Sequence, residues 1–388
     1  MFPYCAILLK LSQLVMFVKR FITWGASPWV CLFASFVSLP VMASENVVLK
    51  SPVALDTQVS RFGEKQSFGA CRSVPSLPHK VISEAFYSDS KASVIDPVKY
   101  KRFLDLRKIV TDEEDYLALQ NTQYIQASSA ARSAIAQCLR SHLIKFAQDD
   151  AFTGSDDIRG GGAVRLMSVT PLMSYLLIRD AGGIDLMDGD QILPWIARLM
   201  DRLLLLEESF KYDNNIEDWT AAAFALGAVA LNRQQLLNHA VAIAEKKSSM
   251  VNADGFLPLE MARGRMALEY SLSAIQALSM VIAVAEANGK SILSEPTGDG
   301  LLRMMRRMVS VINDPASFLQ YADTRDAIDK DHFDRQVMGW LEIYYRKTTD
   351  RDALTAICNH KPLYSWRTGG DWVVLFGSPS QCDHTVSK

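Results

Sequence analysis

Apolar residues recur at helical spacing along most of the chain from about Asp96 onward, with hardly any alternation of period two. Short polar or glycine-rich breaks separate these segments, for example "DDIRGGGAV" and "VNADGFLPLE". The pattern predicts helices over residues 97–108, 111–118, 123–148, 163–180, 190–210, 217–231, 233–248, 262–287, 298–312 and 333–347. About ten helices without strands favour paired helices wound into a ring, an all-α incomplete α/α toroid, over a four-helix bundle. An α-solenoid is the alternative, but no repeated pattern supports it.

The two ends of the helical region have a different pattern. Residues 44–80 carry little periodicity, and we interpret them as an extended N-terminal entry segment that leads into a domain over residues 81–388. Near the other end, "SWRTGGDWVVLFGSPSQC" has the aromatic and β-branched content of a short strand or an irregular cover.

The first 43 residues have the features of an export signal. Lys19 and Arg20 precede an apolar stretch that ends in small residues at Val41 and Ala43, which predicts a signal peptide over residues 1–43, with Met16 as a second candidate start. The expected location is therefore the periplasm. A retained membrane anchor is the alternative, although Gly25 and Pro28 interrupt the apolar run; no later span is expected to cross or stay in a membrane.

Charge and cysteine content narrow the class of protein. A net charge of -2 over 388 residues argues against a nucleic-acid binder. Four cysteines follow the predicted cleavage site, and an even number in an exported chain suggests disulfides. Three pairings are possible, and the distribution along the chain favours Cys71 with Cys138 and Cys358 with Cys382. No CxxC or Cys/His cluster in the sequence indicates zinc, so no metal or cofactor is expected.

Two residues in the predicted helix 262–287 are candidates for chemistry. Arg263 and Tyr270 are seven positions apart, so on a helix they share one face. A guanidinium and a phenol on one face can bind a carboxylate and transfer a proton. An ordinary surface or core pair is the alternative.

Several motifs in a fixed order resemble the periplasmic alginate lyases of polysaccharide lyase family 5. They are "NNxxxW" at residues 214–219, "LNRxxL", "DGFLPxE", "RxxxALxY" and "AxANG", followed by Asn313-Asp314-Pro315 and by "RTGGD" from Arg367. The resemblance covers roughly residues 70–372 and depends on the whole set of motifs. It implies an α/α toroid that binds an acidic polysaccharide and cleaves it by β-elimination at C4–O4 of a uronate.

The resemblance also implies roles for three residues. Asn215 and Arg263 would hold the uronate carboxylate as it becomes enolate-like, and Tyr270 would act as base and then as acid. Since H5 and O4 lie on one side of β-D-mannuronate and of β-D-glucuronate, one phenol can serve both steps. A phenol with a pKa of ~10 is a poor base, so a lowered pKa or concerted transfer is required, and Arg263 is the expected source.

The chain departs from the family pattern beside these residues. Ile216 stands where the family has histidine, and Ser271 and Leu259 also differ from it. Two interpretations remain open: a lyase for a mannuronate- or glucuronate-type polymer, or a polysaccharide-binding component of an exopolysaccharide secretion apparatus with little turnover.

Other residues are candidates for contact with the polymer. Tyr87 and Lys91 resemble a lid loop of the family, Arg367 is a further contact or a packing residue, and Asn214 is both a contact candidate and a helix cap. Trp219 offers a sugar-stacking face or packs in the core.

The remaining polar residues suggest one more alternative. Asp150 and Asp157 lie in an acidic stretch that we interpret as a solvated loop, but paired carboxylates also occur in α/α-toroid glycoside hydrolases. The six histidines show no metal spacing, and His142 is expected to be structural.

Overall fold

The computed structural model of the chain describes residues 48–63, 69–182, 186–322, 335–378 and 382. The predicted signal peptide over residues 1–43 and its alternative, a membrane anchor, therefore lie outside the described residues. Residues 48–388 form one compact unit, which includes most of the predicted entry segment.

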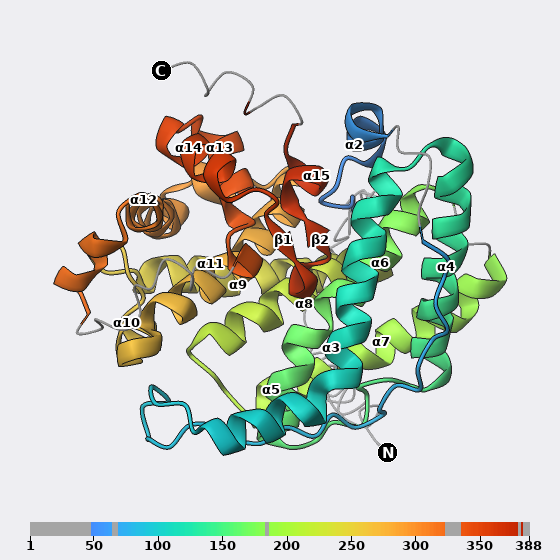
Figure 1. The fold of residues 1–388 in the computed structure, drawn as a ribbon, viewed down its shortest axis with the longest axis horizontal. Helices are drawn as coiled ribbons and strands as arrows, with labels where there is room; N and C mark the ends of the chain where they lie inside the picture. The colour runs from blue at the N-terminus through green and yellow to red at the C-terminus, as the bar shows by residue number, and fades with distance from the viewer. Residues whose placement is uncertain (1–47, 64–68, 183–185, 323–334, 379–381, 383–388) are drawn as a thin grey trace, which may run out of the picture. The chain divides into compact units, whose positions relative to one another are not determined.

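The described residues are mainly helical, as predicted (Figure 1). The α-helices are α2 Leu55–Phe62, α3 Pro97–Gln126, α4 Ser129–Gln148, α5 Ile158–Met167, α6 Val169–Asp180, α7 Leu186–Ser209, α8 Asn215–Leu231, α9 Gln234–Met250, α10 Pro258–Met261, α11 Ala267–Ala287, α12 Asp299–Asn313, α13 Trp340–Thr348, α14 Arg351–His360 and α15 Trp372–Phe376. Two short strands, β1 Tyr364–Ser365 and β2 Gly370–Asp371, pair antiparallel with Tyr364 opposite Asp371.

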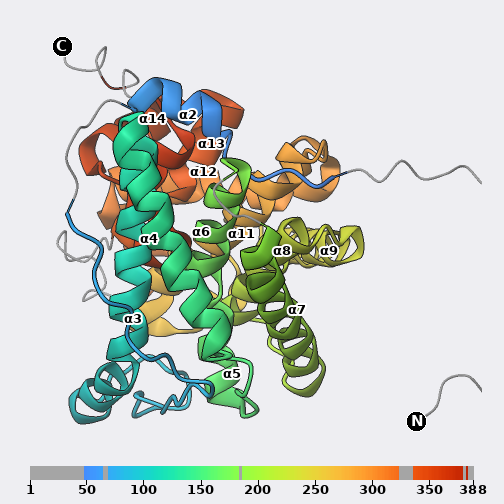
Figure 2. The ribbon, with the colours of Figure 1, turned by 90° about the vertical axis from the view of Figure 1, so that its right-hand side faces the viewer.

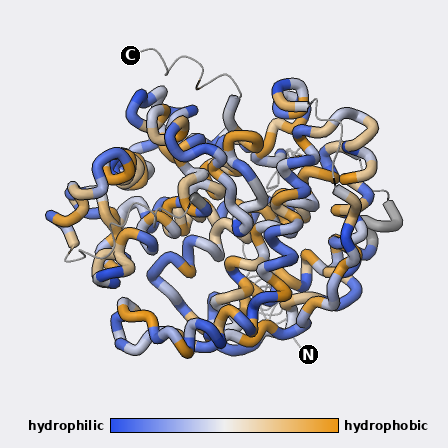
Figure 3. The backbone as a smooth tube through the Cα atoms, viewed as in Figure 1, coloured by the Kyte–Doolittle hydropathy of each residue, from blue (hydrophilic) through white to orange (hydrophobic). Residues whose placement is uncertain are grey.

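Helices α8 and α11 form the centre of this unit, and almost all of their residues are buried. Helices that are apolar on every side require neighbours all round, and α8 packs against α5, α6, α7, α9 and α11. Helices α9 and α12, by contrast, bury one face only. Figure 3 shows hydrophilic and hydrophobic residues mixed along the backbone. This layering of helices is that of an α/α toroid.

Several predicted boundaries were wrong. The segments predicted at 97–108 and 111–118 belong to one long helix, α3, which begins at the cap Asp96 and at Pro97 and is not interrupted until Ala127. Its exposed first half carries ion pairs one turn apart, such as Lys101 with Asp105, which support a helix that buries little. Figure 2 shows α3 beside α4.

Two other expectations need correction. The segment 44–80 is not wholly extended, because α2 lies within it and its Leu55 is buried. Helix α14 was not predicted, and the part of the predicted helix 333–347 that precedes residue 335 lies outside the described residues. Near the other end, the short strands and α15 agree with the expected strand or irregular cover.

The disulfides are those that the sequence favours. Cys71 is bonded to Cys138 and Cys358 to Cys382. The first joins the segment before α3 to α4, and the second joins α14 to the C-terminal end of the described residues.

Two described stretches have the length and apolar composition of a membrane span, which corrects the expectation that no such span follows residue 43. They are Ile158–Asp180 and Gly264–Ala287, and 89% of the apolar window of each is buried inside the helical unit. Burial of this kind is typical of core helices in a packed domain.

Candidate active site

Arg263 and Tyr270 are in contact, but they do not belong to one helix. Tyr270 lies in the first turn of α11, whereas Arg263 follows α10 and precedes a short 3-10 turn at Gly264–Met266. Gly264 has a φ of 55°, a conformation that favours glycine and breaks the helix. The guanidinium carbon of Arg263 nevertheless lies 4.0 Å from the centre of the Tyr270 ring, the geometry of a cation–π contact.

Tyr87 completes this cluster from another part of the chain. Its hydroxyl is hydrogen-bonded to the hydroxyl of Tyr270, and its ring centre lies 5.8 Å from the guanidinium carbon of Arg263. Tyr87 stands at the start of the loop before α3, which in Figure 1 extends towards α10. Residues 183 positions apart therefore meet at one pair of phenols.

The loop that carries Tyr87 is organised by Asp89. The Asp89 carboxylate accepts hydrogen bonds from the backbone N–H groups of Ser93 and Val94, at 2.8 and 2.7 Å, and these bonds lower its pKa to about 2. Lys91, predicted to contact the polymer, is exposed on this turn, where its backbone N–H donates to Asp89. The loop is thus pre-formed by its own hydrogen bonds.

The pKa of Tyr270 is raised, not lowered as required for a preformed phenolate. Burial raises it most, while the hydrogen bond from Tyr87 and the charge of Arg263 lower it by less. Burial likewise raises the pKa of Tyr87. Both phenols are therefore protonated at neutral pH in this conformation.

Asn215 lies at the first position of α8 and is only 3% exposed. Its backbone N–H donates to the Glu260 carboxylate at 2.7 Å, and its side-chain amide donates to the Ser273 hydroxyl at 3.3 Å. Ser273 lies three residues after Tyr270 on α11, and Glu260 lies three residues before Arg263. These contacts place Asn215 beside the elements that carry Arg263 and Tyr270.

A buried lysine holds the start of α8 in place. Lys247 of α9 is 1% exposed, and its ammonium donates to the carbonyl oxygens of Asp213 and Asn214, at 2.7 and 3.2 Å. It also lies 3.4 Å from the carboxylate of Asp218, whose burial raises its pKa to about 8. A buried ammonium is stable only with such partners, so it fixes the turn that presents Asn215.

Two of the predicted polymer contacts have structural roles in this fold. Trp219 is completely buried and donates to Ser273 at 3.0 Å, so it has no face for a sugar. Asn214 is the helix cap, since its side chain accepts a hydrogen bond from the N–H of Ile216. The core alternative is therefore correct for Trp219, while contact of Asn214 with the polymer stays a prediction.

Arg367 belongs to a second charged group that the sequence analysis missed. It stacks on Trp366 at 4.7 Å, and its charge acts on Arg107 and Glu114 of α3. Glu114 is fully buried, which raises its pKa to about 8, and burial lowers the pKa of Arg107 to about 10. Arg107 and Glu114 are seven positions apart, a signal that was hidden because two helices were predicted where α3 is one.

An aromatic series connects this second group to the first. The Arg107 guanidinium lies 4.8 Å from the Phe103 ring centre, Phe103 packs on Phe86 at 4.5 Å, and Phe86 packs on Tyr87 at 4.3 Å. Tyr87 in turn contacts Tyr270. Arginine side chains thus stand at both ends of a continuous series of rings.

The aspartates of the acidic stretch are tied to neighbours, not free in a solvated loop. Asp157 caps α5 by accepting from Arg159 and Gly160, and Asp150 pairs with Arg198 at 2.8 Å. Carboxylates that cap and pair in this way do not form the catalytic pair of a glycoside hydrolase.

Comparison with known proteins agrees with this fold. Residues 79–318 match the model of the alginate lyase family. An alginate lyase of Pseudomonas syringae pv. syringae (strain B728a) is 26% identical over 361 residues, with 90% of this chain and 94% of the relative covered. A polysaccharide lyase of Stenotrophomonas maltophilia (strain K279a) is 25% identical, with 84% and 96% covered.

The fold is also that of a solved structure, a variant of alginate lyase A1-III complexed with tetrasaccharide. The TM-score is 0.70 at 17% identity, and the superposition covers 86% of this chain and 98% of that chain. The α/α toroid, together with these matches, defines a polysaccharide lyase. Because the family match extends over more than half of its length, the chain belongs to the alginate lyase family, which acts on uronate polymers by β-elimination.

The geometry predicts that Glu260 stabilises the start of α8. Replacement by alanine leaves the buried N–H of Asn215 without its acceptor, which should lower the free energy of unfolding by ~1–3 kcal/mol. Glu260→Gln keeps an acceptor oxygen and should restore most of that loss. Urea unfolding of both variants tests this prediction, and an alanine variant as stable as the parent, or a glutamine variant no more stable than alanine, contradicts it.

Proposed function

We propose that the chain cleaves a mannuronate-type acidic exopolysaccharide, with a glucuronate-type polymer as the second candidate, and that Tyr270 is the catalytic base and acid. The contact that supports this proposal is the Arg263 guanidinium stacked on the Tyr270 ring. In both uronates H5 and O4 lie on the same side, so one hydroxyl can take H5 and return a proton to O4. The reaction therefore needs only one proton-transfer group.

Arg263 and Asn215 are the groups proposed to stabilise the enolate-like carboxylate. The Nε of Arg263 is buried without a hydrogen-bond partner among the described residues, so this donor remains for a ligand. Asn215 uses one amide N–H on Ser273 and has a second. A guanidinium and a neutral amide in a site of low dielectric stabilise charge that develops in the transition state.

The proton of Tyr270 must leave before Tyr270 can accept H5. Since burial raises the Tyr270 pKa, the hydroxyl is protonated at the start, and Tyr87 is the group bonded to it. We assign Tyr87 as the relay through which this proton exchanges with solvent when the polymer enters. The raised pKa also makes Tyr270 well suited to the last step, donation to O4.

Ile216 accounts for the proposed substrate preference. It stands at the position that we assign to the family histidine, and an isoleucine side chain can neither accept a proton nor donate to a carboxylate. Elimination from guluronate needs a base on the face opposite to O4, and Tyr270 alone cannot supply both faces. The chain should therefore favour a polymer in which H5 and O4 are on one side.

Arg367 and Arg107 are proposed to bind a part of the polymer that is distant from the reacting sugar. A polyanion needs positive charge along its path, and Glu114 with its raised pKa is neutral at pH 7, so it leaves both arginine charges uncompensated. This positively charged pair, Arg107 and Arg367, fits an acidic polysaccharide as partner. Export to the periplasm, and association with an exopolysaccharide secretion apparatus, belong to the same proposal and depend on the predicted signal peptide.

The first prediction from this proposal concerns Tyr270. Tyr270→Phe removes only the hydroxyl and should lower kcat by roughly 10³-fold, because it removes the proton-transfer group of both steps. Tyr87→Phe should lower kcat less, since it removes only the relay. The measurement is the absorbance of the unsaturated uronate product on polymannuronate.

Tyr321→Phe is the matched control, because the Tyr321 ring also lies under an arginine, Arg307, at 4.9 Å. This variant should keep full activity. Retained activity in Tyr270→Phe would refute the assignment. A parent protein that binds the polymer without forming unsaturated product would support the alternative function, a polysaccharide-binding component.

A second prediction concerns pH. The pKa of Glu114 is about 8, far above its usual value, so the group is neutral below pH 8 and becomes a carboxylate as the pH rises through 8. The group formed by Arg107, Arg367 and Glu114 then loses one unit of net positive charge. Polymer binding should therefore weaken about fivefold, or by about 1 kcal/mol. Glu114→Gln should bind as the parent does at pH 7 and lack this step.

Binding to Tyr270→Phe at constant ionic strength, measured by calorimetry between pH 6.5 and 9.5, gives this profile without turnover. A step of the same size in a protein that also carries Glu114→Gln would show that another group causes it.

A further inference from the structure

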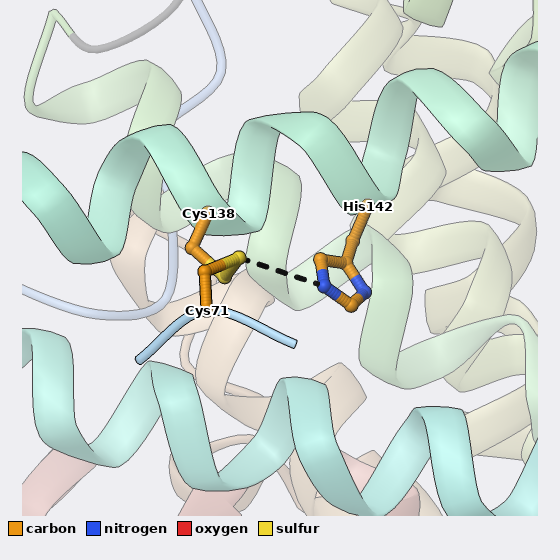
Figure 4. A group of neighbouring side chains, drawn as sticks. All are labelled: Cys71, Cys138 and His142. Carbon is orange, nitrogen blue, oxygen red and sulfur yellow. Dashed lines mark hydrogen bonds between the residues drawn. A yellow bond between two sulfur atoms is a disulfide. The ribbon is translucent and has the colours of Figure 1, made fainter. Parts of the chain in front are cut away.

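A second cluster of chemically reactive side chains surrounds the Cys71–Cys138 disulfide (Figure 4). Cys138 and His142 lie one turn apart on α4, and Cys71 comes from the segment before α3. The Sγ of Cys71 is 4.0 Å from Nε2 of His142, and one potential ligand atom from each of the three residues lies within 4.8 Å of the others. Cysteines and a histidine far apart in sequence thus meet in the fold, although no Cys/His motif predicted it.

His142 is held in the orientation of a metal ligand. It is fully buried, and its Nδ1 is hydrogen-bonded to Glu113, which is also fully buried and pairs with Arg72 at 2.6 Å. When the Nδ1–H of His142 donates to the Glu113 carboxylate, Nε2 is the ring nitrogen that is left to act as a ligand. The lone pair of Nε2 then points towards Cys71, and the carboxylate–histidine pair has the arrangement that supports metal ligands in proteins.

The sulfur of Cys138 also has a polar neighbour. Its Sγ lies 3.2 Å from the hydroxyl of Tyr116. That hydroxyl accepts from the N–H of Arg72 at 3.1 Å, so its own proton is available for the sulfur. Cys71 itself is exposed, so a reductant or an ion can approach from solvent.

We propose that reduction of this disulfide converts the cluster into a zinc site with Cys71, Cys138 and His142 as ligands. A dithiol reductant donates two electrons and two protons, is itself oxidised to a disulfide, and leaves two thiols on the protein. Zinc binding then displaces both thiol protons. Two thiolates and an imidazole are a donor set that Zn²⁺ favours, and its tetrahedral geometry leaves one position for water.

The rearrangement required is small. With Zn–S distances of ~2.3 Å and a Zn–N distance of ~2.0 Å, the two sulfurs of a tetrahedral site lie roughly 3.7 Å apart. The two sulfurs must therefore move apart, while His142 keeps its hydrogen bond to Glu113. The metal would take the place of the covalent bond that joins α4 to the segment preceding α3.

The second disulfide of the same chain provides a matched control. Cys358 and Cys382 are joined in the same way, but among the described residues only the Cys71, Cys138 and His142 group brings three potential metal ligands together. Of the four cysteines that the structure describes, the double variant Cys358→Ser/Cys382→Ser keeps Cys71 and Cys138, the proposed site. The double variant Cys71→Ser/Cys138→Ser keeps Cys358 and Cys382, the control pair, and both variants share Cys5 and Cys31.

The experiment is a zinc titration of the full chain, oxidised or reduced with a phosphine under nitrogen, against a chromophoric chelator. Reduced parent and reduced Cys358→Ser/Cys382→Ser should bind one zinc per chain, and oxidised parent none at the site. Co²⁺ should give a thiolate-to-metal absorption band in the same samples. Glu113→Gln keeps all three ligands and should weaken zinc binding about 10- to 100-fold.

Two results would overturn the proposal: no zinc bound by the reduced parent, or equal zinc bound by reduced Cys71→Ser/Cys138→Ser. Thermal unfolding gives an independent measure, since zinc should raise the Tm of the reduced Cys358→Ser/Cys382→Ser variant and leave that of the reduced Cys71→Ser/Cys138→Ser variant unchanged. An unchanged Tm in both would also contradict it.

Discussion

The proposed chemistry of this protein depends on two opposed effects on one phenol, Tyr270. Burial of Tyr270 raises its pKa, while the positive charge of Arg263, 4.0 Å from the ring centre, favours the phenolate. If the tyrosine were next to the arginine but not buried, it would be open to water. If it were buried without the arginine, its pKa would be too high for the phenolate to form. The structure combines both, and in the proposed mechanism a polymer carboxylate bound next to the guanidinium would shift this balance.

The rest of the site keeps that balance in place through buried polar contacts. Glu260 and Lys247 bind the start of α8 from two sides, one through the N–H of Asn215 and the other through the carbonyl oxygens before it. Such groups are costly to bury without partners, and here each has at least one. The amide at Asn215 is therefore held in place by these contacts, as its proposed role in stabilising a developing charge requires.

The sequence predicted the helical class from periodicity, and it predicted the toroid and the candidates Arg263 and Tyr270 from several motifs whose order along the chain is specific. The stacking of Arg263 on Tyr270 was not predicted. It could not predict that Gly264 breaks the helix between those two residues, since a single glycine is also tolerated inside helices. The sign of the Tyr270 pKa shift depends on burial, which no local pattern contains. The same is true of Glu114, and of His142 beside the Cys71–Cys138 disulfide.

Trp219 shows that a residue can match a family motif and still have no contact with the polymer. Its place in a matched motif made it a candidate for sugar stacking, but α8 is surrounded by helices on all sides and the indole is buried. The motif identifies a residue that belongs to the family fold. Only the burial of its side chain in the structure shows whether it supports the site or can contact the polymer.

The most direct measurement compares initial rates of unsaturated uronate formation by the purified chain on polymannuronate and on polyguluronate, at equal uronate concentration. The account, in which Tyr270 acts on one face and Ile216 supplies no second base, predicts that polymannuronate is cleaved and polyguluronate is not cleaved at a comparable rate. Rapid cleavage of polyguluronate would contradict it, because a base on the opposite face would then have to exist.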